Sequence, residues 1–228
     1  MPPHLGLIGR TATTDEPMRC AVLISGSGSG MEALVHAQRA APLAHQTVLV
    51  ISNQTDAEGV QRALALGLAT EVVPHLKPSG ERIPRHDHEA AVLEVLGQHN
   101  IEIVVLAGYM RLLSPRFLSR WGRPVVNIHP SLLPNFPGAH AHRDVLTSGA
   151  TVTGCSIHLV DEGMDTGDLI AQACVPVLPH DDEVSLGRRV KVEEHRLYPQ
   201  VLSWIAEGRV QLTTDGLRVE GQAPNRVC

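Results

Sequence analysis

Short apolar runs alternate with segments of helical period through the first half of the chain. The expected strands are residues 19–24, 47–51, 70–73 and 103–107, and the expected helices are residues 31–39, 59–66 and 88–98. Such alternation is typical of parallel strands joined by right-handed helical crossovers. Phe, Tyr and Trp occur only twice each, so the core must be mainly aliphatic, as buried parallel strands prefer. The sequence therefore predicts an open, mostly parallel, twisted α/β sheet of Rossmann-like type with helices on both faces.

The pattern changes after residue 107. We expect strands at residues 125–128, 152–160 and 169–177, a long helix at residues 184–207, and a hairpin at residues 209–219 that turns at Asp215-Gly216. Pro199 is expected to end or kink the long helix, because proline lacks the backbone N–H that the helix needs. We find no repeat or linker, and predict one domain over residues 18–228 after a loose extension at residues 1–17.

Charge and composition exclude several classes of protein. The net charge of −5 argues against a general binder of nucleic acid or of anionic membranes, which would need a basic face. The apolar runs are too short to span a bilayer, and the first 17 residues do not resemble a secretory signal. Four cysteines without a C-x-x-C pair indicate a reducing compartment and no disulfide framework. We expect a cytoplasmic protein that acts on small molecules.

A glycine cluster, Gly26-Ser27-Gly28-Ser29-Gly30, stands between the first expected strand and helix. Backbone N–H groups of such a turn converge on an anion at the positive end of the helix. The cluster matches neither the dinucleotide motif G-x-G-x-x-G nor the phosphate-binding loop with its lysine. The cluster therefore indicates a phosphate-binding site but does not identify the molecule that carries the phosphate. The alternative is a tight turn with no ligand.

Asn127 and His129 lie two residues apart at the end of an expected strand, so their side chains point to the same face. Open α/β sheets bind ligands at the carboxyl ends of their strands. An amide donor beside an imidazole suits acyl transfer, in which an oxyanion must be stabilised and a proton moved. The alternative is a structural asparagine that caps the loop and a buried histidine with satisfied nitrogens.

Other histidines raise the question of a metal. His140, His142 and Asp144 have ligand-like spacing, but no H-E-x-x-H motif or cysteine partner accompanies them. The pair His86 and His88 is no stronger. We assign no metal.

Several of these segments together resemble the phosphoribosylglycinamide formyltransferases, the folate-dependent enzymes of purine synthesis. The resemblance covers residues 19–208. The matching motifs are Val22-Leu23-Ile24-Ser25-Gly26, Leu106-Ala107-Gly108-Tyr109-Met110-Arg111-Leu112-Leu113-Ser114, Asn127-Ile128-His129-Pro130-Ser131-Leu132-Leu133-Pro134, Thr153-Gly154-Cys155-Ser156-Ile157-His158, Asp165, and Glu194-His195 before Tyr198-Pro199.

The resemblance implies two ligand sites. The glycinamide ribonucleotide would be held by Gly28, Ser29 and Gly30 at its phosphate and by Lys191, Val192, Glu193 and Glu194, with Lys191 near the phosphate and Glu194 at the ribose hydroxyls. The folate would be held by Met110, Arg111, Leu112, Leu113, Asn127 and the loop Asp161, Glu162, Gly163, Met164 and Asp165, with Arg85 near its tail. Two positions depart from the family: the residues after Arg85, and Gly30, where asparagine is frequent.

The implied reaction moves a formyl group from the co-substrate 10-formyltetrahydrofolate to the amine of the ribonucleotide. Asn127 would donate a hydrogen bond to the oxyanion, and protonated His129 would stabilise it and deliver a proton. Asp165 would keep His129 charged and take a proton from the attacking amine. The reaction needs neither a metal nor a covalent enzyme intermediate, and the protein is expected to be a monomer or homodimer.

Three other functions remain open. Formyltetrahydrofolate deformylase uses water in place of the amine, but usually has an amino-terminal regulatory domain and tends to differ at Pro130. Methionyl-tRNA formyltransferase normally has an added basic domain. A non-enzymatic module that senses nucleotide or folate would need the phosphate loop without Asn127, His129 and Asp165.

Overall fold

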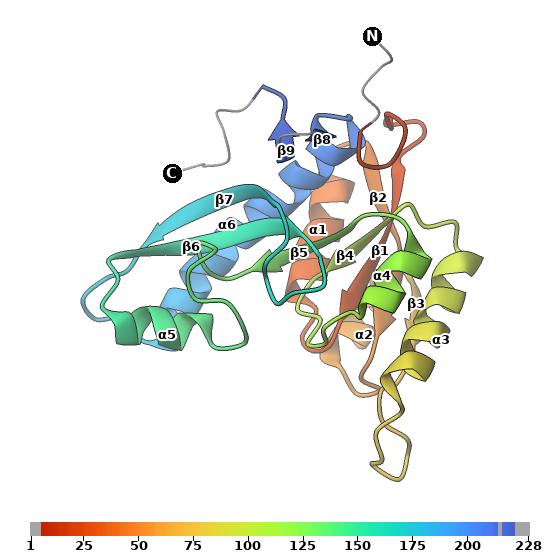
Figure 1. The fold of residues 1–228 in the computed structure, drawn as a ribbon, viewed down its shortest axis with the longest axis horizontal. Coiled ribbons are helices and arrows are strands. Elements are labelled where there is room, and N and C mark those ends of the chain that lie inside the picture. Colours follow the sequence, from red (N-terminus) through yellow and green to blue (C-terminus); the bar gives the residue numbers. More distant parts are fainter. Residues whose placement is uncertain (1–5, 214–215, 222–228) are drawn as a thin grey trace. The chain divides into compact units, whose positions relative to one another are not determined.

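The computed structural model describes residues 6–213 and 216–221 (Figure 1). The chain divides into two compact units, one formed by residues 12–125 and the other by the residues up to 11 and from 126 onward. Each unit is described separately below. The single domain expected over residues 18–228 stays a prediction.

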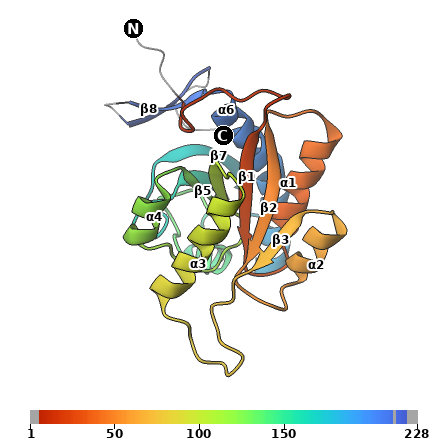
Figure 2. The ribbon, with the colours of Figure 1, turned by 90° about the vertical axis from the view of Figure 1, so that its right-hand side faces the viewer.

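Four parallel strands form the centre of the unit at residues 12–125, in the order β3-β2-β1-β4. They are β1 (Met18–Ile24), β2 (His45–Ser52), β3 (Ala69–Val72) and β4 (Ile103–Leu106). Helices α1 (Ser29–Ala40) and α2 (Glu58–Ala65) cover one face, and α3 (Arg85–Gln98) and α4 (Pro115–Trp121) cover the other (Figure 2). Because both faces are covered, β1 is fully buried from Cys20 to Ile24.

Helix α4 was not predicted, although its start carries a local signal. The Ser114 hydroxyl accepts a hydrogen bond from the Phe117 N–H at 3.1 Å, and Pro115 occupies the first turn. Serine followed by proline is a typical helix start, since the proline N–H would be unpaired there in any case. At 7 residues the helix is too short to show a clear apolar period.

Antiparallel strands dominate the unit from residue 126 onward. Strand β5 (Val125–His129) pairs with β6 (Val152–Leu159), which pairs with β7 (Leu169–Pro176). Helix α5 (Ala141–Ser148) follows β5, and α6 (Glu183–Ala206) packs against β6 and β7 (Figure 1). The expected fold class, an open and mostly parallel α/β sheet, is confirmed.

Two expectations near the carboxyl end have different outcomes. The hairpin is confirmed as β8 (Val210–Thr213) with β9 (Gly216–Val219), although residue 215 of its expected turn lies outside the described residues. Helix α6 does not end at Pro199, which lies inside it. The residues after Pro199 are largely buried, and this packing outweighs the lost backbone hydrogen bond.

The extension at residues 1–17, expected to be loose, has one close backbone contact within its described part. A Cβ on Gly6 would lie 2.7 Å from the Cα of Gly208, so the two backbones touch where glycine has no side chain. Residues 1–5 lie outside the described residues, and the boundary at residue 17 stays a prediction.

The cysteines correct one expectation. Cys20 and Cys155 are buried free thiols, and burial raises the pKa of Cys155 to about 12. Cys174, however, is disulfide-bonded, a bond that the expectation of a reducing compartment without a disulfide framework did not include. Formation of the bond requires only that two Cα atoms lie within about 7 Å, which sequence spacing does not reveal. Cys228 lies outside the described residues. No described helix is both long and apolar enough to cross a membrane.

Candidate active site

Strands β5 and β6 bring polar side chains together at the end of β5. Asn127 lies opposite His158 in the antiparallel pairing, and His129 lies opposite Ser156. The Asn127 amide nitrogen is 3.1 Å from Nε2 of His158. His129 is buried, with only 4% of its surface exposed. The strand pairing therefore fixes these side chains as one group before any loop contributes to it.

Asp165 joins this group from the loop between β6 and β7. Its Oδ2 lies 3.3 Å from Nδ1 of His129 and accepts a hydrogen bond from the Gly138 N–H at 2.8 Å. Its Oδ1 lies 3.5 Å from the Asn127 amide nitrogen and 3.6 Å from Nε2 of His158. The structure thus places all three residues named as catalytic within reach of one another.

His158 is a member of this group that the sequence analysis did not single out. Its Nδ1 lies 2.8 Å from the Leu159 carbonyl, which only accepts, so Nδ1 carries the proton. Its Nε2 lies 3.1 Å from the Asn127 amide nitrogen and 3.6 Å from Oδ1 of Asp165. The signal in the sequence was the alternating strand at residues 152–160, but only the register between strands shows that His158 faces Asn127.

The carboxylate of Asp165 is held in its charged form. Burial is the largest influence and favours the neutral acid, but hydrogen bonds from His158 and Gly138, with the charge of His129, outweigh it and lower the pKa of Asp165. Its backbone φ of +58° is left-handed, a conformation that aspartate tolerates better than most residues.

His129 differs from expectation. Burial lowers its pKa, and although the hydrogen bond to Phe136 and the charge of Asp165 oppose this, the net shift is downward. The prediction that the neighbouring carboxylate keeps His129 charged is therefore wrong for the free protein: desolvation outweighs the carboxylate. Nε2 lies 2.8 Å from the Phe136 carbonyl and must donate to it, so Nδ1, facing Asp165, is the nitrogen that titrates.

The turn after β5 is held by a network of buried polar groups. The Ser156 hydroxyl donates to the Ser131 carbonyl at 2.6 Å and accepts from the Leu133 N–H at 3.0 Å. The Gln172 amide donates to the Leu133 carbonyl and to the Ser156 hydroxyl. Satisfied networks of this kind rigidify a site, so the Phe136 carbonyl is fixed where it meets His129.

The loop at residues 161–165, named above for the folate, is organised by its own first residue. One carboxylate oxygen of Asp161 accepts from the Gly163 N–H at 3.0 Å and from the Thr166 hydroxyl at 2.7 Å. A Cβ on Gly167 would lie 1.8 Å from the Leu159 carbonyl oxygen, so only glycine fits there. Met164 is 52% exposed and Glu162 is also exposed. The loop thus holds Asp165 inward while it presents residues 162–164 to solvent.

The glycine cluster lies in the other unit, at the start of α1. Gly28 has a φ of +70°, and a Cβ there would lie 2.7 Å from the Cα of Gly59, so this position requires glycine. The Met110 N–H donates to the Ser25 hydroxyl at 2.8 Å, and the Ser25 N–H donates to the Gly108 carbonyl at 3.1 Å. Ser25, the residue just before the cluster, and Met110, in the segment named for folate binding, are therefore hydrogen-bonded neighbours.

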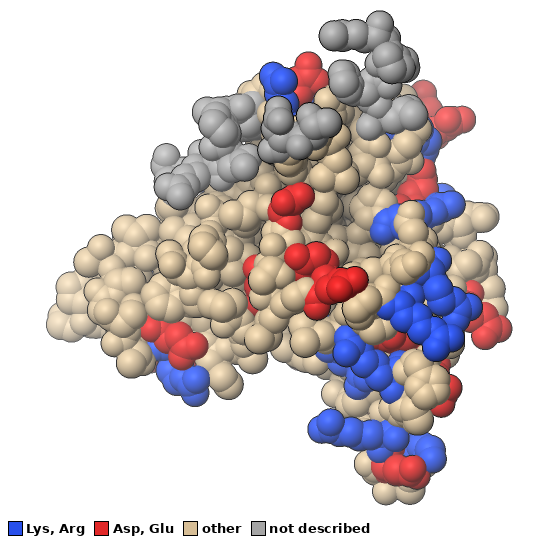
Figure 3. Space-filling view, viewed as in Figure 1, with Lys and Arg blue, Asp and Glu red and all other residues tan. Residues whose placement is uncertain are grey.

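Arg85 adjoins that segment. Its guanidinium donates to the Leu112 carbonyl and to Glu89, and Glu89 also accepts from the N–H and hydroxyl of Ser114. Lys and Arg side chains gather on this side of the unit, over α3, α4 and the loop before α3 (Figure 3). Carboxylates such as those of a folate tail would find a favourable potential there.

The ribonucleotide residues on α6 lie in the same unit as His129. Lys191 is exposed, as is Val192, whereas Glu193 pairs with Arg196 at 2.6 Å. Glu194 is partly buried, and this desolvation raises its pKa to about 7, although Lys191 acts in the opposite direction. These residues and the glycine cluster belong to different units, so their joint action on one phosphate stays a prediction.

Comparison with known proteins identifies the family. A family model described as formyl transferase matches residues 18–202. The chain belongs to the formyl transferase family. It is 38% identical over 205 residues to the phosphoribosylglycinamide formyltransferase of Escherichia coli, covering 90% of this chain and 95% of that protein. It is 42% identical over 198 residues to the human trifunctional purine biosynthetic protein adenosine-3, covering 87% of this chain but 19% of that protein.

Solved structures agree with this family. Glycinamide ribonucleotide transformylase 1 from Symbiobacterium toebii superposes with a TM-score of 0.83 at 39% identity, covering 89% of this chain and 94% of that one. The phosphoribosylglycinamide formyltransferase from Coxiella burnetii, in complex with CHES, also gives 0.83 at 37% identity, covering 91% and 95%. This formyl transferase spans 14% to 21% of the length of the trifunctional relatives, with the chicken protein at 21%.

The remaining histidines in the described part of the chain raise the question of a metal site. Among the described residues no group of three or more His, Cys, Asp or Glu side chains is arranged to hold a metal. Nε2 of His88 lies 2.9 Å from the Val73 carbonyl, and burial lowers the pKa of its ring. Nε2 of His88 therefore has a structural partner, whereas its Nδ1 is buried without a hydrogen-bond partner among the described residues.

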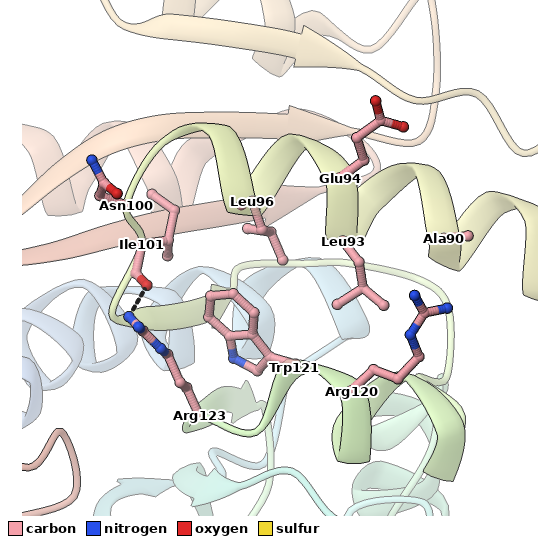
Figure 4. A pocket seen from close by; sticks show the side chains of 10 residues that line it. Ala90, Leu93, Glu94, Leu96, Asn100, Ile101, Arg120, Trp121 and Arg123 are labelled. Atoms are coloured by element: carbon pink, nitrogen blue, oxygen red, sulfur yellow. Dashed lines mark hydrogen bonds between the residues drawn. The ribbon is translucent and has the colours of Figure 1, made fainter.

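A hollow of about 620 Å³ between α3 and α4 lies apart from the named residues (Figure 4). The Trp121 ring forms one wall, and the Arg123 guanidinium lies 5.9 Å from its centroid while donating to the Ile101 carbonyl. Arg120 and Leu93 also line the hollow. None of the residues named for catalysis or binding contributes to it.

Proposed function

We propose that this formyl transferase moves the formyl group of 10-formyltetrahydrofolate to the amine of 5′-phosphoribosylglycinamide. The products are the N-formyl ribonucleotide and tetrahydrofolate, which makes the protein a one-carbon transferase of purine biosynthesis. The observation that carries the proposal is the convergence of Asn127, His129 and Asp165 at the end of β5. Support also comes from two relatives named phosphoribosylglycinamide formyltransferase, each of which this chain matches over 95% of its length.

The amine attacks the formyl carbon and converts the carbonyl oxygen into an oxyanion. The Asn127 amide, already placed by His158 and Asp165, donates a hydrogen bond to this oxygen. A single positioned donor of this kind is typically worth about 3 kcal/mol of barrier. The amide nitrogen has two N–H donors, so the longer contact, 3.5 Å to Asp165, is the one that the oxyanion replaces.

Proton transfer falls to the pair formed by His129 and Asp165. In the free protein His129 favours its neutral form and Asp165 its charged form, so Nδ1 is ready to receive a proton. The attacking amine loses a proton as the tetrahedral intermediate collapses, and the departing folate nitrogen gains one. We assign both transfers to Nδ1 of His129, with Asp165 stabilising the imidazolium that forms between them.

The residues named above are assigned to binding the two substrates. We assign the phosphate to Gly28, Ser29, Gly30 and Lys191, and the ribose hydroxyls to Glu194. The folate is assigned to residues 110–113 and 161–165, with its carboxylate tail towards Arg85 in the basic region of Figure 3. A cytoplasmic location and a monomeric or homodimeric state stay predictions.

A two-substrate assay tests the proposal. The purified protein is given 10-formyltetrahydrofolate with and without the ribonucleotide, and tetrahydrofolate, formate and formylated ribonucleotide are all measured. We expect tetrahydrofolate to form only when the ribonucleotide is present, in equal amount to its formylated product. Formate release without ribonucleotide would instead identify a deformylase, and tight binding without turnover would identify a sensing module.

A further inference from the structure

The ring of His142 lies directly against helix α6. A Cβ placed on Gly187 would lie 3.3 Å from both Cδ2 and Nε2 of His142. Glycine in the interior of a helix is unfavourable because it loses more backbone freedom than any other residue. Gly187 is not needed for a left-handed backbone conformation, because it lies within the regular helix Glu183–Ala206. What its missing side chain provides is room for the imidazole.

The helix face under His142 is the one that carries the assigned ribonucleotide residues. Positions three and four apart lie on the same face of a helix. That face of α6 carries, in order, Glu183, Gly187, Lys191 and Glu194. The charges that act on His142 include those of Glu183 and Lys191, one turn before and one turn after Gly187. His142 is therefore seated in the middle of this face.

His142 also has an unsatisfied nitrogen. Nδ1 is buried and has no hydrogen-bond partner among the described residues. Buried polar atoms without partners are rare in native proteins and call for a specific reason. His129 and Lys191 are both near enough to influence the titration of His142 electrostatically. A ligand that spans those two residues would supply the missing partner.

We propose that His142 is a further binding residue for the ribonucleotide, and that its imidazole hydrogen-bonds to the sugar–phosphate part of that substrate. The inference rests on the proposed function. Burial lowers the pKa of His142, with the charges of His129 and Lys191 acting in the same direction and Glu183 opposing them. The ring is then neutral at pH 7 and can donate from one nitrogen and accept at the other.

The test compares His142→Ala with the wild-type protein in two measurements. Ribonucleotide Kd is measured by calorimetry without folate, and KM for each substrate is measured by turnover. We expect Kd and KM for the ribonucleotide to rise about tenfold, as loss of one hydrogen bond in a buried site implies. The KM for 10-formyltetrahydrofolate should change less than twofold. His142→Asn, whose amide can occupy the place of Nδ1, should recover part of the loss.

Gly187→Ala provides a second, independent variant. Its methyl group would displace the imidazole, so we expect the ribonucleotide KM to rise in the wild-type background but not in the His142→Ala background. His180→Ala, at an exposed histidine in the same unit, is the matched control and should leave both constants unchanged. Melting temperatures of all variants show whether any has lost its fold.

The outcomes separate this inference from the proposed function. If wild-type protein neither binds the ribonucleotide nor transfers formyl groups, the proposed function fails. If wild-type protein does both and His142→Ala binds the ribonucleotide equally well, the role of His142 is contradicted. An equal effect of Gly187→Ala in both backgrounds would likewise contradict it, because Gly187 would then act by another route.

Discussion

Asp165 Oδ2 lies 3.3 Å from Nδ1 of His129, and the same oxygen accepts the backbone N–H of Gly138 at 2.8 Å. The Gly138 hydrogen bond fixes the carboxylate independently of the histidine. The pair is therefore built so that a proton arriving on His129 meets a negative charge that is already in position. This arrangement leads to specific expectations for each member of the group.

Asp165→Asn should lower kcat by roughly 100- to 1,000-fold, the range typical of a lost acid–base or oxyanion contact. The amide oxygen can still accept from Gly138, so the loop should keep its conformation and the melting temperature should stay within a few degrees. Removal of the negative charge also removes an influence that raises the pKa of His129, which should fall further. Steady-state kinetics and NMR titration of His129 check both effects. Unimpaired turnover would refute the pairing.

His158→Ala removes a positioning residue. Its Nε2 lies 3.1 Å from the Asn127 amide nitrogen and helps to keep the pKa of Asp165 low. We expect kcat to fall about tenfold with both KM values nearly unchanged. The pKa of Asp165 should rise, so the acid limb of the kcat–pH profile should move to higher pH. A lower kcat with an unshifted profile would show that His158 supports only the fold.

Glu194→Gln should change both the KM for the ribonucleotide and the pH dependence of folding stability, and the two effects can be measured separately. Because burial raises the folded pKa to about 7, well above the ordinary 4.5, the folded protein retains a proton that the unfolded chain has released between those values. Stability from this group is therefore fully present below about pH 4.5 and is lost as the pH rises through 7.

Glutamine removes that pH dependence. The variant should be more stable than the wild type at pH 8 by roughly 1–2 kcal/mol, and nearly equal at pH 4.5. The KM for the ribonucleotide should rise, because the carboxylate assigned to the ribose hydroxyls is gone. Chemical denaturation at the two pH values gives the stability difference, and a variant less stable than wild type at pH 8 would contradict the desolvation argument.

Gly30→Asn should restore the residue that is frequent in the family. A Cβ at Gly30 would meet only the Ala107 Cβ, at an ordinary 3.7 Å, so the side chain has room. We expect a few tenths of a kcal/mol in stability from better helix propensity and a lower KM for the ribonucleotide. Gly28→Ala is the contrasting control: its φ of +70° and the nearby Gly59 backbone make any side chain costly. A higher KM in Gly30→Asn would show that the family contact does not form here.

Most helices and strands could be predicted from the apolar period of the sequence, but helices α4 and α5 could not. The expected strand at residues 103–107 is β4, Ile103–Leu106, because a buried run of β-branched residues is distinctive. Helices α4 and α5, with 7 and 8 residues, were not predicted, although α2, which also has 8, was predicted at residues 59–66. The long helix expected at residues 184–207 is α6, Glu183–Ala206, and it continues past Pro199 because burial of its last turns outweighs the lost backbone hydrogen bond.

In the site, Asn127 and His129 could be found from their spacing of two on one strand, but their partners could not. Asp165 reaches them through a loop, and only the family resemblance pointed to it. His158 faces Asn127 because of the register between β5 and β6, which is a tertiary property. The lowered pKa of His129 depends on how deeply the ring is buried, and sequence spacing carries no information on that.

The most direct test of the account is the turnover of His129→Ala with both substrates saturating. His129 is the group to which both proton transfers are assigned, so kcat should fall at least 100-fold. Both KM values should stay within about threefold, and the circular dichroism spectrum should match the wild type. Retention of most of the wild-type turnover would remove His129 from the chemistry and contradict the account.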